Sequence, residues 1–141
     1  MPKEIIESPD VFPLRKYKNL DPPNGIPINM AVKTKGAVMY NKVVPVNPQG
    51  ESVAPDDCLA QTRQVLENLA AMVKAAGAEM TDIVATTWYT TDIDAYYGSD
   101  SSQLRREFIP EPYPTSVVVE ISRLAQPEWK VELLAVVSVP D

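Results

Sequence analysis

The stretch Gln61-Thr62-Arg63-Gln64-Val65-Leu66-Glu67-Asn68-Leu69 decides most of the fold of this chain. It belongs to a longer segment, 57–76, in which apolar residues recur at helical spacing and so predict an amphipathic helix. Acidic residues stand where this helix begins, and Gly77 stands where a left-handed residue would end it. The run 83–89 is rich in β-branched and aromatic residues and predicts a buried strand.

The other periodic segments predict a sheet and one more helix. Two helices packed on one face of a sheet would bury the apolar sides of all these elements. The expected fold class is therefore α+β with one mixed sheet. The uncovered sheet face would carry Val, Met, Tyr and Trp, which makes it a candidate surface for self-association. The remaining predicted elements are a strand at 28–34, a turn at 35–36, a strand at 37–44, a helix at 102–109 and strands at 116–121 and 130–139.

Proline dominates the N-terminal region. Six of the fourteen prolines precede residue 30, which excludes a regular helix or a central strand there. We therefore expect residues 1–27 to form an extended arm laid over the domain. The length of 141 residues predicts a single domain that spans 1–141.

Composition excludes several classes of function. The net charge is −6 and the densest basic spot is the pair Arg105-Arg106, so nucleic-acid binding is not expected. Without histidine, the chain lacks the usual neutral-pH base and the commonest metal ligand, and no zinc spacing is present. No apolar run reaches the roughly 18 residues of a membrane span, and no signal peptide is evident, which predicts a cytoplasmic protein.

The single cysteine, Cys58, has two interpretations. It stands at a predicted helix start, where a thiolate could be stabilised. Free cysteine is more often a small buried hydrophobe, so a packing role is favoured.

Five segments together resemble the RidA/YjgF family of imine and enamine deaminases, formerly called L-PSP endoribonucleases. The resemblance spans about residues 26–139. It implies a chorismate-mutase-like sandwich that assembles as a homotrimer, with small-molecule sites in the clefts between subunits and no cofactor. The segments are Pro45-Val46-Asn47-Pro48, the stretch 61–68, Ala76-Gly77 with Asp82-Ile83-Val84, Val119-Glu120-Ile121-Ser122-Arg123-Leu124, and Val131-Glu132-Leu133-Leu134-Ala135-Val136.

The resemblance also marks where this chain departs from the family pattern. Active members carry an arginine, two residues after a proline, that grips the substrate carboxylate, and Ser116 stands in its place here. A hydroxyl cannot replace that bidentate, charged grip. The family's tyrosine after a proline corresponds to Ile28, and its serine-glycine pair corresponds to Asn41-Lys42.

Four residues could compensate for the missing arginine or line the site. Lys42 could bring a cation near the lost position, or it could be a solvated lysine at an edge. Arg105 and Arg106 could supply the grip across a subunit boundary, although arginines on a short helix are more often solvated. Tyr113 precedes Pro114 at the rim where the family site opens, so it is the aromatic residue expected nearest a ligand.

The acid of the family's last strand is kept as Glu132, inside an otherwise apolar strand. The resemblance favours a catalytic role in which this carboxylate positions a water, and burial in a cleft would suit it to proton transfer. Backbone groups near Ser116 and Val117 would hold the carbonyl end of the substrate. The predicted function is hydrolytic deamination of a small imine or enamine. The alternatives are a non-catalytic ligand-binding trimer, or a hydrolytic or tautomerising step on a ring-cleavage product.

Overall fold

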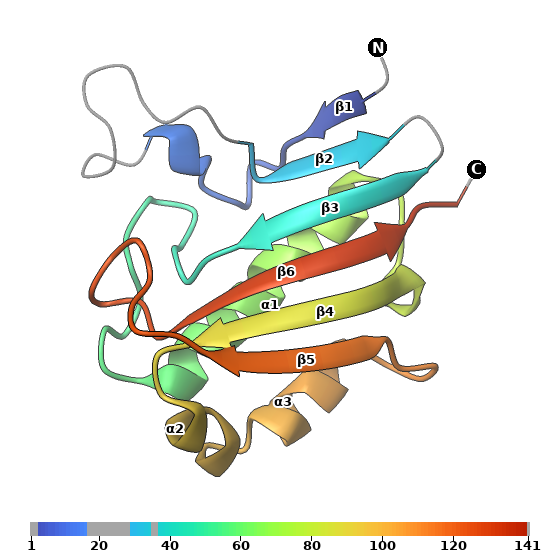
Figure 1. Ribbon diagram of the computed structural model, residues 1–141. Coiled ribbons are helices and arrows are strands. Elements are labelled where there is room, and N and C mark those ends of the chain that lie inside the picture. Colours follow the sequence, from blue (N-terminus) through green and yellow to red (C-terminus); the bar gives the residue numbers. More distant parts are fainter. Residues whose placement is uncertain (1–2, 17–28, 35–36, 141) are drawn as a thin grey trace.

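The computed structural model describes residues 3–16, 29–34 and 37–140. Its centre is a six-stranded sheet in the order β1-β2-β3-β6-β4-β5 (Figure 1). Neighbouring strands are antiparallel except β4 and β5, which are parallel. The strands are β1 Lys3–Ile6, β2 Ala31–Thr34, β3 Val38–Val43, β4 Ile83–Thr90, β5 Thr115–Glu120 and β6 Val131–Ser138.

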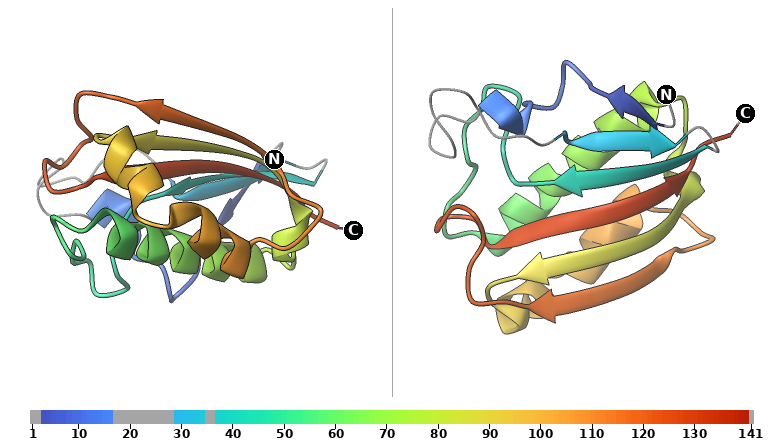
Figure 2. Two further views of the ribbon diagram at one scale, coloured as in Figure 1. Left: turned by 90° about the horizontal axis from the view of Figure 1, so that it is seen from below. Right: turned by 45° about the horizontal axis from the view of Figure 1, so that its top comes forward.

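The α-helices of the described residues pack on one face of the sheet, as Figure 2 shows. They are α1 Cys58–Ala75, α2 Ile93–Gly98 and α3 Ser101–Phe108. Helix α1 lies against β3 and β6. Helices α2 and α3 form the crossover that the parallel pair β4 and β5 requires. The predicted α+β class, a mixed sheet covered on one face, is confirmed, but three helices cover it rather than two.

Helix α1 begins and ends as the sequence predicts. Asp57 is its N-cap, with a carboxylate oxygen that accepts a hydrogen bond from the backbone N–H of Ala60 over 3.0 Å. Gly77 adopts φ = +77° beyond the last turn. The N–H groups of Gly77 and Ala78 then bond to the carbonyls of Lys74 and Val73, which is the paired pattern that a left-handed residue closes.

Two buried amides of α1 hold neighbouring loops in place. The Gln61 amide nitrogen donates to the carbonyls of Val53, Ala54 and Glu128, and its oxygen accepts from the N–H of Lys130 over 2.7 Å. Asn68 donates to the carbonyls of Val44 and Val46, again from a buried position. Buried loop carbonyls need hydrogen-bond donors, so Gln61 and Asn68 stabilise the fold.

Two segments differ from their predicted structure. Residues 3–6 lie between prolines and form β1, an edge strand paired with β2, where an extended arm was expected. Residues 92–99 were expected to form a turn but contain α2, because Asp92 caps that helix by accepting a hydrogen bond from the N–H of Ala95. The rest of the expected arm beyond residue 16, Ile28 and the turn at 35–36 lie outside the described residues.

The two faces of the sheet carry different side chains. The helix-covered face is apolar and includes the fully buried Trp88 and Leu133. The open face presents exposed apolar residues, Tyr40, Val117 and Leu134 among them. In the described part of the chain, no helix is both long and apolar enough to cross a membrane.

Candidate functional site

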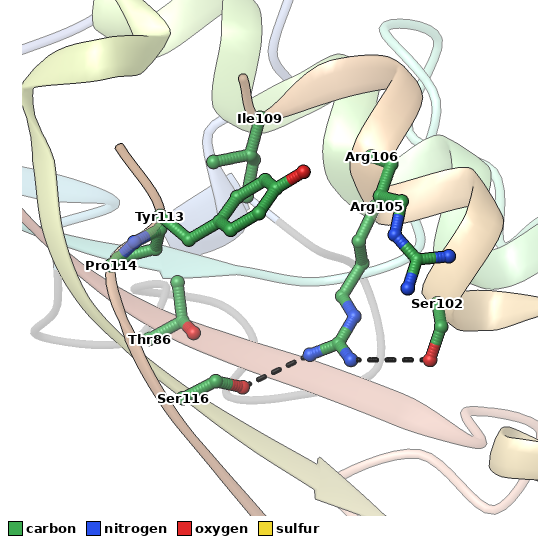
Figure 3. Close-up of a pocket in the computed structure, with 8 residues that line it drawn as sticks. All are labelled: Thr86, Ser102, Arg105, Arg106, Ile109, Tyr113, Pro114 and Ser116. Atoms are coloured by element: carbon green, nitrogen blue, oxygen red, sulfur yellow. Dashed lines mark hydrogen bonds between the residues drawn. The ribbon is translucent and has the colours of Figure 1, made fainter. Parts of the chain in front are cut away.

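A cavity of about 210 Å³ lies at one edge of the sheet, on the helix side. Its floor comes from β4 and β5, one wall comes from α3, and its rim comes from segment 109–114 (Figure 3). Ser116 and Thr86 stand side by side on the floor because they are register partners in the parallel pair. Tyr113 is exposed and lies at the rim of this cavity.

Arg105 and Arg106 are the charged groups that line this cavity from α3, and Arg105 contacts its floor. The Nη1 of Arg105 donates a 2.9 Å hydrogen bond to the Oγ of Ser116, and its Nη2 lies 3.5 Å from the Oγ of Ser102. The guanidinium carbon lies 5.8 Å from the ring centre of Tyr96, within the range of a cation–π contact. Three contacts therefore fix the direction of a side chain that would otherwise have many rotamers.

The charge of Arg105 is not neutralised by an ion pair within the described residues. Its Nε is buried and has no hydrogen-bond partner among them. Glu107, two positions along the same helix, instead contacts Arg63 of α1 over 3.5 Å. Arginines are rarely removed from water without a partner, so the cavity is a place where an anion would be stabilised.

Tyr96 packs against the Arg105 guanidinium as a neutral ring. The side chain is fully buried and packs on Trp88, with 5.6 Å between the ring centres. Burial raises the pKa of Tyr96 far above its usual value, although the nearby Arg105 opposes the shift. The phenol therefore stays protonated and neutral, and the ring offers Arg105 only its π face.

Lys42 and Glu132 form a separate pair. The Nζ of Lys42 donates to the Oε1 of Glu132 over 3.1 Å, and both side chains are partly buried. They lie on the open face of the sheet because the neighbouring residues of both strands, Val43 and Leu133, are fully buried on the helix side. Each charge is thus compensated within the chain.

The sheet separates this pair from the cavity. Glu132 pairs with Tyr89 of β4, which in turn pairs with Val119 of β5. Glu132 is therefore two strands, or about 10 Å, from the edge strand, and Ser116 is about 10 Å further along it. Because the two groups also face opposite sides, Glu132 cannot contact a ligand held at Arg105 of the same chain.

The other predicted ligand-binding residues are divided in the same way. Val117 follows Ser116 and faces the open side, where it is exposed. Asn41 is fully buried on the helix side of β3, and its amide nitrogen lies 3.3 Å from the carbonyl oxygen of Ala135. Ile28 lies outside the described residues. The structure therefore brings Ser116, Arg105 and Tyr113 together and places Lys42, Val117, Asn41 and Glu132 elsewhere.

Sequence reasoning did not assign three residues of this arrangement to the site: Thr86, Tyr96 and Ser102. Thr86 reaches the floor only through the parallel register of β4 and β5. Tyr96 comes from α2, which was expected to be a turn. The helical spacing of Ser102 and Arg105 would have been a usable signal, since residues three apart share a helix face. In the described ranges, no three side chains of Cys, Asp or Glu could hold a metal ion together.

Comparison with known proteins gives this cavity a context. The family model described as Endoribonuclease L-PSP matches residues 22–139. The chain belongs to this family, which is the RidA/YjgF family. One relative is the 2-iminobutanoate/2-iminopropanoate deaminase from Escherichia coli. It is 32% identical to this chain over 113 residues, which cover 78% of this chain and 85% of that protein.

Solved structures of this family agree with the fold. The crystal structure of the YjgF gene product from Escherichia coli matches with a TM-score of 0.76 at 27% identity, covering 96% of this chain and 98% of that chain. Escherichia coli TdcF, crystallised with bound serine, matches with a TM-score of 0.73 at 27% identity, covering 97% and 99%. The predicted family membership is confirmed.

Proposed function

We propose that this protein hydrolyses a small imine or enamine that carries a carboxylate, with the carboxylate held at Arg105. The observation that carries this proposal is the contact between Arg105 and Ser116 beside the cavity. Ser116 occupies the sequence position of the family's gripping arginine, and a guanidinium from α3 reaches that position. The relationship to a 2-iminobutanoate/2-iminopropanoate deaminase and to a serine-bound family member supports a substrate of amino-acid size.

Lys42 is the weaker candidate for the same role. Its ammonium is already paired with Glu132 on the opposite face of the sheet. A carboxylate bound there would have to compete with an existing anion, whereas the described residues leave Arg105 without one.

The proposed reaction needs one water and no redox partner. An enamine first becomes the imine by taking a proton on carbon and losing one from nitrogen. Water then adds to the imine carbon, both of its protons pass in turn to nitrogen, and the C–N bond breaks. Ammonia leaves as the new C=O bond forms, so a 2-imino acid gives a 2-oxo acid. In this scheme Glu132 accepts the proton of the attacking water, since the chain contains no histidine.

A complete site on this scheme needs a second copy of the chain. Glu132 lies on the open face of its own sheet, away from the cavity. A homotrimer in which the open face of one copy approaches the β5 edge of the next would bring both halves together. The exposed Tyr40, Val117 and Leu134 support burial of that face against another copy.

The test of function is an ammonia-release assay on freshly generated 2-iminopropanoate and 2-iminobutanoate. We expect turnover in the wild type and at least tenfold lower kcat/KM in Arg105→Met, since a hydrogen bond to a charged group contributes about 1.5–3 kcal/mol. Saturable binding of the corresponding 2-oxo acids without any turnover would instead support the ligand-binding alternative.

Light scattering gives an independent test of the assembly. A trimer mass is expected in dilute buffer. A monomer that still deaminates would show that Glu132 of a second copy is not required.

A further inference from the structure

We propose that the substrate is a dicarboxylate, bound by Arg105 at one end and by Arg106 at the other. This inference rests on the proposed function and names its substrate class. Both arginines line the cavity, and Figure 3 shows both guanidinium groups on its α3 wall. A monocarboxylate would satisfy only one of them.

The two arginines differ in burial and in their contacts. Arg105 is partly buried and held by Ser116, Ser102 and the Tyr96 ring. A fixed cation of this kind suits the substrate carboxylate next to the reacting imine carbon. Arg106 is exposed, and it makes no ion pair within the described residues. An exposed cation that lines a cavity suits a distal carboxylate whose position varies with chain length.

The surrounding charges favour this assignment. The whole chain carries a net charge of −6. The two arginines, which make no ion pair within the described residues, make the potential at this cavity more positive than elsewhere on such a chain. The nearest acid in the sequence, Glu107, contacts Arg63 of α1 and not either arginine of the cavity. A doubly negative ligand gains more from this field than a singly negative one.

The cavity also provides an apolar wall for the carbon chain between two charged ends. Ile109 and Pro114 line it, and the exposed ring of Tyr113 closes the rim. Its volume of about 210 Å³ holds a short chain and excludes large side groups. The substrate class is therefore a short-chain 2-imino or 2-enamino dicarboxylic acid.

The test uses a matched pair of inert product analogues, 2-oxoglutarate and 2-oxopentanoate, which differ only in the distal carboxylate. Calorimetry at low salt gives both dissociation constants for the wild type. We expect 2-oxoglutarate to bind at least tenfold more tightly. Arg106→Met should abolish that preference and leave 2-oxopentanoate binding unchanged. Arg105→Met should weaken the binding of both acids.

Arg123→Met is the matched control, because Arg123 is an exposed arginine that does not line the cavity. It should change neither constant, and melting temperatures should confirm that every variant folds. Equal affinity of the wild type for the two acids, or a preference that survives in Arg106→Met, would overturn the dicarboxylate inference while leaving the deaminase proposal standing. Failure of both acids to bind, together with no imine turnover, would overturn both.

Discussion

The guanidinium of Arg105 donates a 2.9 Å hydrogen bond to the hydroxyl oxygen of Ser116. Eleven positions separate the two residues in sequence, and they come from a helix and an edge strand. The contact places a cation from α3 beside the strand position that the family resemblance predicts to hold an arginine.

Exchanging the two residues tests that relationship. Arg105→Ser alone should weaken binding of 2-oxopentanoate about tenfold or more, because a charge-assisted hydrogen bond is lost. Adding Ser116→Arg should restore most of the affinity, since the guanidinium returns to the same cavity. Affinity in the double variant no better than in Arg105→Ser would show that the helix position itself is essential.

Glu132→Gln should lower kcat about 10²- to 10⁴-fold, since Gln cannot accept a proton at neutral pH. The oligomeric mass should stay the same, and the partly exposed ion pair with Lys42 should account for about 1 kcal/mol of stability at most. Lys42→Met is the control because it breaks the same pair but keeps the carboxylate. An equal loss of kcat in Lys42→Met would assign the effect to the ion pair.

Tyr96 should act as a positioning residue for Arg105. Tyr96→Phe keeps the ring and should leave the KM for the imine and the pH profile of kcat/KM unchanged, because the buried phenol, with its raised pKa, stays neutral. Tyr96→Leu removes the cation–π contact and should raise KM about 2- to 30-fold, in line with about 0.5–2 kcal/mol. A pH profile altered in Tyr96→Phe would mean that the hydroxyl takes part directly.

Gln61→Glu should destabilise the fold by about 3 kcal/mol or more. The substitution points carboxylate oxygens at three buried carbonyls that the native amide satisfies. Urea unfolding measures the change. Gln103→Glu, on the exposed side of α3, is the matched control and should stay within about 0.5 kcal/mol. Equal losses of unfolding free energy in the two variants would show that the buried contacts of Gln61 do not stabilise the fold specifically.

Cys58 should behave as a protected thiol. Burial raises its pKa above the ordinary 9.0, so the folded protein holds less thiolate than the unfolded chain at any given pH near that value. Alkylation by iodoacetamide at pH 8 should be slow in buffer and fast in urea. This group stabilises folding below the ordinary pKa and loses that contribution as the pH rises through the folded pKa. Rapid alkylation of the folded protein would restore the reactive-thiolate interpretation.

Much of the fold could be predicted from the sequence because its signals are local. The helical spacing of apolar residues, Asp57 at the start and Gly77 at the end predicted α1 within one residue of its observed bounds. Alternating and β-branched runs predicted five of the six strands, four of them within one residue of their observed bounds, whereas β2 begins at Ala31 and the strand was expected from residue 28. The N-terminal strand was missed because its four residues lie among prolines and become a strand only by pairing with β2.

The candidate site could be predicted only in part, because its members meet through non-local contacts. The sequence by itself determined that no histidine is present, and it predicted that Ser116 stands where the family pattern has a charged residue. Only the tertiary structure decided where the two candidate cations lie, since α3 packs beside β5 while Lys42 turns to the other face and pairs with Glu132. The physical reason is that local sequence sets the backbone periodicity, whereas the packing of helix on sheet and the strand register decide which charges share a cavity.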